Sequence, residues 1–173
     1  VEQYVKKDIP HPSAEPLTDT RLSDWLSLGC VSASYIYRSV KAAQSHAVTE
    51  DAIIINLLKR EFLHWTLLRF GPRMFKPSGV KHLFNRRWKN DNAAFDKWRN
   101  GQTENQSVNG IIEKLTTTGF ITTAEREMAA RCLVDDLDVN WTWGAMYFES
   151  LLLDYEASVN WGRWNTLAGV GED

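Results

Sequence analysis

Tryptophan is the residue type whose abundance first suggests chemistry in this sequence. The chain of 173 residues holds eight tryptophans, and an indole combines a large apolar surface with a single N–H donor. Taken singly, indoles such as Trp88, Trp141 and Trp164 are more typical of a helical core than of a functional site. Their number alone therefore assigns them no role.

A second candidate is an anion site where the first helical segment begins. The stretch Thr18–Ser23 brings hydroxyls, an arginine and a helix start together, and the free N–H groups and dipole of a helix start attract anions. Plain N-capping explains the same residues. Arg126 and Asp154 pose a similar choice, because an ion pair between them is compatible with a functional or a purely structural role.

Residue spacing argues against several other chemistries. The histidines at 11, 46, 64 and 82 are scattered, and none lies four residues from another or beside a carboxylate cluster, so no zinc or di-iron site is expected. The sequence has no glycine-rich phosphate loop and no Gly-x-Ser-x-Gly motif. We therefore predict no catalytic nucleophile and no metal.

Composition predicts one soluble domain. Twenty Lys and Arg against 22 Asp and Glu give a net charge of -2, too little for an overall attraction to nucleic acid, and no apolar run is long enough to cross a bilayer. Cys30 and Cys132 fit no metal or disulfide pattern, and we expect both to be buried. No signal peptide is visible, and a removed transit peptide would leave no trace, so the cytoplasm and an organelle such as the chloroplast stroma both remain open.

Helical periodicity runs through most of the chain without period-two alternation, so the predicted fold is all-α. Residues 1–18 read as a proline-rich lead-in to a helical domain over 19–173. We expect 73–90 to be basic and irregular and the tail at 154–173 to be mostly irregular. The expected helices cover residues 22–28, 32–44, 49–70, 92–100, 107–118, 122–137 and 142–153.

Several motifs in a fixed order resemble the C-terminal flavin-binding helical domain of the photolyase/cryptochrome family, especially its DASH-type cryptochromes. The resemblance extends from Asp19 to Gly171. The matching segments are Arg21–Cys30, Lys59–Phe62 (the family's Trp-Arg-Glu-Phe with the Trp changed), Thr117–Phe120 followed by Arg126, and Trp143–Trp164 followed by Ala168–Gly171.

The resemblance implies one FAD and a role for each matching residue. Asp19, Thr20, Arg21, Leu22 and Ser23 would surround its diphosphate, and Arg60 would lie beside the cofactor. Arg126 and Asp154 would pair alongside the isoalloxazine, Glu156 would lie near the ribityl–adenine side, and Asn160 would face flavin N5. Trp164, Trp141 and Trp88 match, from the flavin outward, the three indoles that relay an electron from the surface.

The departures from the family pattern weigh against DNA repair. The lesion-facing Glu is Asn56 here, the Trp that stacks on damaged bases is Lys59, and the lesion-contacting Asn is Thr123. The second aromatic after the proximal indole is Thr166, and the family's Gly-Tyr-Pro has become Glu104-Asn105-Gln106. Enzymatic activity is therefore left open, with repair not expected.

Two classes of function remain on the sequence alone. One is a stand-alone, photoreducible flavoprotein or photoreceptor, and the other is a scaffold subunit that has inherited the fold, with structural FAD or none. No counterpart of the family's N-terminal antenna domain is present, so no antenna pigment is assigned. Loss of that domain would expose apolar surface, which predicts a protein partner or self-association, with weak or no binding of nucleic acid.

Overall fold

The computed structural model describes residues 22–42 and 48–172. The predicted lead-in over 1–18 and the candidate residues Asp19, Thr20 and Arg21 lie outside them. The regular elements among the described residues are all helical, and one isolated bridge joins Lys89 and Val139, which confirms the all-α prediction. They group into two compact units divided between Phe62 and Leu63, and each unit is described separately.

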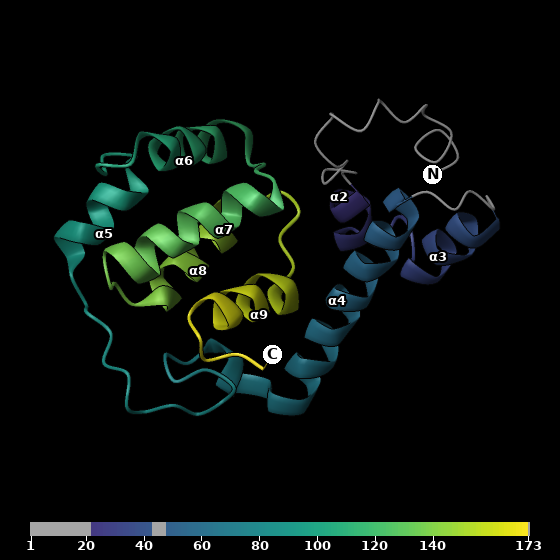
Figure 1. Cartoon of the computed structure of the whole chain (residues 1–173), viewed down its shortest axis with the longest axis horizontal. Coiled ribbons are helices and arrows are strands. Elements are labelled where there is room, and N and C mark those ends of the chain that lie inside the picture. Colours follow the sequence, from purple (N-terminus) through teal and green to yellow (C-terminus); the bar gives the residue numbers. More distant parts are fainter. Residues whose placement is uncertain (1–21, 43–47, 173) are drawn as a thin grey trace. The chain divides into compact units, whose positions relative to one another are not determined.

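The N-terminal unit is small. It contains α2 (Leu22–Ser27), α3 (Ala33–Ala42) and the first part of α4 (Val48–Phe70), as labelled in Figure 1. Its buried core consists of Ile36, Val40 and Leu57, with partly buried neighbours around them. A core of this size stabilises a unit only weakly, so we expect this part of the chain to open more readily than the rest.

The C-terminal unit holds the main core. The rest of α4 leads into a 3-10 turn, and four helices and a π turn follow before α9, in the green to yellow part of Figure 1. Trp98, Trp141, Phe148, Leu133 and Ile112 are all fully buried there. The elements are the 3-10 turn Gly71–Phe75, α5 (Asn92–Arg99), α6 (Gln106–Thr118), α7 (Thr123–Arg131), the π turn Cys132–Asp136, α8 (Trp141–Leu151) and α9 (Ala157–Leu167).

Side-chain caps define where α5, α6, α7 and α8 start. Thr122 and Glu125 form the predicted capping box at the start of α7, which satisfies two orphan N–H groups at once. Burial opposes ionisation of Glu125, but hydrogen bonds from Lys114 and Thr122 outweigh it and lower the pKa of the carboxyl. The end of α6 is equally well defined, because Gly119 adopts φ +68° and donates to Leu115 O, a left-handed conformation that glycine adopts without strain.

The prediction of a mostly irregular tail is wrong, because α9 covers Ala157–Leu167. Its sequence contains Asn160, Gly162 and Asn165, which have low intrinsic helix propensity. Burial outweighs that preference: Trp161 and Trp164 are both buried in the main core. The predicted helix over 122–137 also changes character, since the α-helix ends at Arg131 and a π turn follows.

The prediction of an irregular stretch over 73–90 is wrong for residues 73–75, which belong to the 3-10 turn, and is confirmed for 76–90. The stretch 76–90 is nevertheless firmly anchored. Asn165, 1% exposed, accepts from Val80 N and donates to Met74 O. Lys81 N donates to Val170 O, and Lys89 pairs with both Asp138 and Asn140 through the backbone. Irregular backbone of this kind keeps its shape because its polar groups are satisfied by the helical core.

The two cysteines differ, contrary to the expectation that both are buried: Cys132 is buried and Cys30 is exposed. Burial, together with the nearby Asp136, raises the pKa of the Cys132 thiol to about 11. We therefore expect a maleimide at neutral pH to label one thiol quickly in native protein and the second only after unfolding. Mass spectrometry of the alkylated peptides checks this, and rapid native labelling of Cys132 would contradict the structure.

No helix among the described residues has the combination of length and apolarity needed to cross a membrane.

Candidate functional site

The clearest polar arrangement in the C-terminal unit is the pair of Arg126 and Asp154. Arg126, on α7, donates from Nη2 to both carboxylate oxygens of Asp154 at 2.8 Å, and its Nε donates to Ile121 O at 3.0 Å. The Asp154 residue is only 7% exposed. Charge-assisted hydrogen bonds of this kind fix both side chains, so the pair presents a rigid polar surface.

A further cation, Arg163, interacts electrostatically with this pair and was not among the predicted site residues. Burial and then the charge of Arg126 lower the pKa of the Arg163 guanidinium, while Glu127 and Asp154 act in the opposite direction. Two guanidinium groups and two carboxylates therefore interact electrostatically at this place. The spacing could have revealed it, because Arg163 follows Asn160 by three residues in one helix.

Two other predicted residues lie at the start of α9. Asn160 donates from its side-chain amide to Ala145 O at 3.0 Å, which holds it against α8. Glu156 is the N-cap residue of α9 and contacts the ring of His64, while Ser158 Oγ donates to the same carboxylate at 3.4 Å. His64 was not among the predicted site residues. It follows Arg60, which was predicted, by four residues in α4, so the two lie on the same face of that helix.

Trp164 lies in the core, 2% exposed. Its ring meets Phe148 edge-on with centroids 5.2 Å apart, and a Cβ at Gly144 would collide with it. Trp98 also packs edge-on against it at 6.4 Å. The indole is therefore held in one orientation by α5 and α8.

Trp141 and Trp88 lie close together because they share one acceptor. The indole N–H of Trp141 donates to Pro77 O at 3.1 Å and that of Trp88 donates to the same oxygen at 3.0 Å. Trp141 is fully buried whereas Trp88 is only partly buried. The two indoles thus connect the core with the surface of the 76–90 stretch.

The aromatic cluster is larger than the three indoles that the sequence singled out. Trp161 packs edge-on against Trp141 at 5.8 Å, and Trp98 packs against Tyr147 at 5.6 Å. Only the count of eight tryptophans hinted at these neighbours, because ring contacts between separate helices leave no fixed spacing in the sequence.

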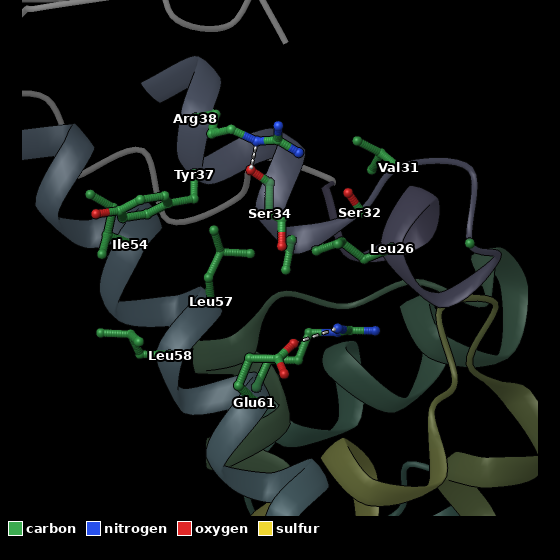
Figure 2. A pocket seen from close by; sticks show the side chains of 13 residues that line it. Leu26, Val31, Ser32, Ser34, Tyr37, Arg38, Ile54, Leu57, Leu58 and Glu61 are labelled. Carbon is green, nitrogen blue, oxygen red and sulfur yellow. Dashed lines mark hydrogen bonds and ion pairs between the residues drawn. The ribbon is translucent and has the colours of Figure 1, made fainter. Parts of the chain in front are cut away.

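In the N-terminal unit, Leu22 and Ser23 occupy the first turn of α2, and Arg60 lines a cavity of about 800 Å³ between α2, α3 and α4. Figure 2 shows Leu26, Val31, Tyr37 and Leu57 around this hollow. Arg60 also pairs with Glu61 at 3.6 Å. The cavity has the size of a small-molecule site, with one ion pair in a mainly apolar lining.

The structure thus brings Arg126 and Asp154 together, places Asn160 in the same unit against α8, and places Arg60 within the other unit. The residues that depart from the family pattern, Asn56, Lys59 and Thr123, are exposed. Thr166 is also exposed and donates from Oγ1 to Gly162 O at 3.2 Å, which uses its hydroxyl within α9.

Comparisons with known proteins agree on one relationship. A family profile described as the FAD binding domain of DNA photolyase matches residues 53–173. A Cryptochrome DASH of Synechocystis is 37% identical over 157 residues, which cover 89% of this chain and 32% of that protein. A chloroplastic/mitochondrial Cryptochrome DASH of Arabidopsis thaliana is 30% identical over 182 residues, 99% of this chain and 32% of its own length.

A solved structure shows the same relationship in three dimensions. The Synechocystis cryptochrome superposes with a TM-score of 0.84 at 36% identity, over 88% of this chain and 32% of that chain. The chain spans about a third of the length of the curated relatives that it matches.

Proposed function

Because this chain belongs to the photolyase/cryptochrome family as one of its FAD-binding domains, we propose that it is a photoreducible flavoprotein whose indoles carry electrons inward from the surface. FAD is the cofactor of this family of domains. The observation that supports the proposal best is the arrangement of Trp164 in the core and of Trp141 and Trp88 on one carbonyl oxygen.

The charged groups suit a flavin dinucleotide. Arg126 pairs with Asp154, and these charged groups would lie alongside a ring system that becomes more negative on reduction. Arg60 lines the cavity of the other unit, and a diphosphate needs such cations, amides or hydroxyls when it leaves water. We assign the FAD contacts to Leu22, Ser23, Arg60, Arg126, Asp154, Glu156 and Asn160, with Asp19, Thr20 and Arg21 beyond the described residues.

Bound FAD that absorbs blue light supplies a one-electron oxidant. With FAD bound, Trp164 would give up one electron, Trp141 would refill Trp164, and Trp88 would refill Trp141. Each transfer moves the positive hole toward the surface, where an external donor can neutralise it before the electron returns. With only one indole in the core, the electron would return from the flavin before an external donor could neutralise the hole. A series of three indoles therefore suits photoreduction.

The test starts with the purified protein. Denaturation should release about one FAD per chain, read from its absorption spectrum, as expected for a stoichiometric site. Blue light with dithiothreitol should then bleach the oxidised flavin band of the native protein. Absence of releasable flavin would instead favour the second candidate, a scaffold that keeps the fold without the cofactor.

We also propose that repair of cyclobutane pyrimidine dimers is absent or very weak. Asn56 cannot supply the proton or negative charge of a Glu, and Lys59 offers no aromatic face to a flipped base, the stacking on which contributes about 1–3 kcal/mol. We expect no measurable repair of a dimer-containing oligonucleotide under light, with an intact photolyase assayed alongside. Repair at a rate similar to that enzyme would refute this prediction.

Self-association is the expected partner interaction. Large apolar side chains stay exposed along α4, and patches of this kind mark binding surfaces. They are Ile55, Leu58, Phe62, Trp65 and Leu68. Sedimentation at increasing concentration should show dimers or larger species, and Leu58→Glu should shift them toward monomer. Leu153→Glu, at a similarly exposed position in the other unit, is the matched control; a wild-type protein that stays monomeric throughout argues against self-association.

A further inference from the structure

The stretch 71–90 is the most positively charged part of the chain. It contains six Lys and Arg residues and no Asp or Glu, although the whole chain carries a net charge of -2. All six cations are exposed. They are Arg73, Lys76, Lys81, Arg86, Arg87 and Lys89. This segment, which we call the basic segment, therefore produces a local positive potential on an otherwise acidic molecule.

One cation of the basic segment is fixed directly over Trp88. The guanidinium carbon of Arg86 lies 4.0 Å from the centre of the Trp88 ring, and its Nη1 donates to Ala168 O at 2.8 Å. Ala168 is the C-cap residue of α9, where the partial negative charge of a helix end favours a cation. Arg86 is thus held in position by the core and not only by its attraction to the indole.

Two carboxylates are associated with the surroundings of Trp88, and both already have partners. Asp138 pairs with Lys89 at 3.4 Å, and Asp91 accepts from Ala94 N at 3.0 Å as the N-cap of α5. Among the described residues, neither carboxylate forms an ion pair with Arg86. The outer indole therefore has a fixed positive neighbour.

This arrangement has a consequence for electron transfer. A positive hole on Trp88 would lie about 4 Å from a fixed positive charge, which disfavours it by roughly five-fold to several hundred-fold, depending on the local dielectric. A negative group bound at Arg86 would remove much of this opposition. The same group would be attracted by the other cations of the basic segment.

We propose that Arg86 and the basic segment select an anionic one-electron donor for Trp88. The donor passes one electron to the oxidised indole, is itself oxidised by one electron, and leaves the indole neutral; no bond forms or breaks and no proton is required. The inference rests on the proposed function for the direction of electron flow. The binding of an anion at Arg86 is inferred only from the contacts of Arg86 with Trp88 and Ala168.

Flash photolysis tests the proposal with two probes of opposite character. Ferrocyanide is a strongly anionic one-electron donor, and ferrocenemethanol is a neutral one. In Arg86→Gln the driving force for reducing the indole radical changes in the same way for both donors, whereas only ferrocyanide also loses an attraction. We therefore expect the rate constant for ferrocyanide, divided by that for ferrocenemethanol, to fall about threefold or more. Arg131→Gln, an exposed arginine on α7, is the control and should change neither rate.

The ratio of the two rate constants separates recognition from a structural defect. A variant that merely distorts the relay would change both rate constants by a similar factor, and an unchanged ratio overturns the proposal. Added salt should slow the ferrocyanide reaction and leave the ferrocenemethanol reaction unchanged.

A second measurement needs neither light-driven chemistry nor flavin. Fluorescence quenching of Trp88 is obtained as the difference between wild type and Trp88→Phe, with iodide as the anionic quencher and acrylamide as the neutral one. We expect iodide to be favoured over acrylamide in wild type and this preference to be lost in Arg86→Gln. If no indole radical forms, the proposed function fails, while this quenching ratio still decides for or against an anion site at Arg86. Protection of Trp88 by a short single-stranded oligonucleotide at physiological salt would assign the surface to nucleic acid and overturn selection of a donor.

Discussion

Replacing Trp164 by phenylalanine should lower the rate of flavin photoreduction about a hundredfold, because phenylalanine is far harder to oxidise and each 1.4 kcal/mol added to a barrier costs a factor of ten. The ring stays large enough to pack against Phe148 and Trp98, its present neighbours. Steady-state bleaching of the flavin band under blue light with dithiothreitol measures the effect.

Two further variants serve as a control and as a comparison for Trp164→Phe. Trp65→Phe removes an indole that is 67% exposed on α4 and should photoreduce like the wild type. Trp88→Phe should slow photoreduction less than Trp164→Phe, because the inner transfers still occur but the hole no longer reaches the surface. If Trp164→Phe photoreduces at the wild-type rate while it still binds flavin, the relay does not operate in this protein.

Replacing Asn165 by leucine should destabilise the protein by about 3–5 kcal/mol, since each buried backbone group left without a partner costs about 1–3 kcal/mol. Asn165 accepts from Val80 N and donates to Met74 O and Trp161 O, and leucine has a similar volume without any of these bonds. Urea unfolding followed by circular dichroism measures the change.

Asn85→Leu is the matched control for this prediction, because Asn85 is exposed in the same irregular stretch. Its effect should stay within about 0.5 kcal/mol, as for most surface substitutions. Equal stabilities of the two variants would show that the anchoring hydrogen bonds of Asn165 contribute little. In that case the fixed position of Pro77 O, which accepts from both Trp88 and Trp141, would need another explanation.

Periodicity and caps allowed most of the helices to be predicted from sequence. The capping box of Thr122 and Glu125 is local, as is the glycine that ends α6, and both were predictable because their partners lie within a few residues. The helix α9 was not, since its residues have weak helical preference and owe their conformation to burial of Trp161 and Trp164 against the other helices. Its formation depends on contacts that are distant in sequence.

The same distinction applies to the candidate site. The residues named from the family pattern were found by ordered motifs, and the structure brings Arg126 within hydrogen-bond distance of Asp154. The interactions of Arg163, His64 and Arg86 could not be predicted, because each of these residues contacts or senses a partner that is distant in the sequence. A basic stretch around Trp88 was visible in the sequence, but the guanidinium over its ring was not.

The fit between Gly144 and Trp164 restricts how this sequence can drift. No side chain fits at position 144 while an indole occupies position 164, because even a methyl group there would meet the ring and the side chain of Leu133. A lineage that exchanges the indole for a smaller ring would open space at position 144, and an alanine could then settle there. After that second step a return to tryptophan would be blocked by the new methyl group. Loss of the inner indole would thus become irreversible through packing alone, even if selection for photoreduction returned.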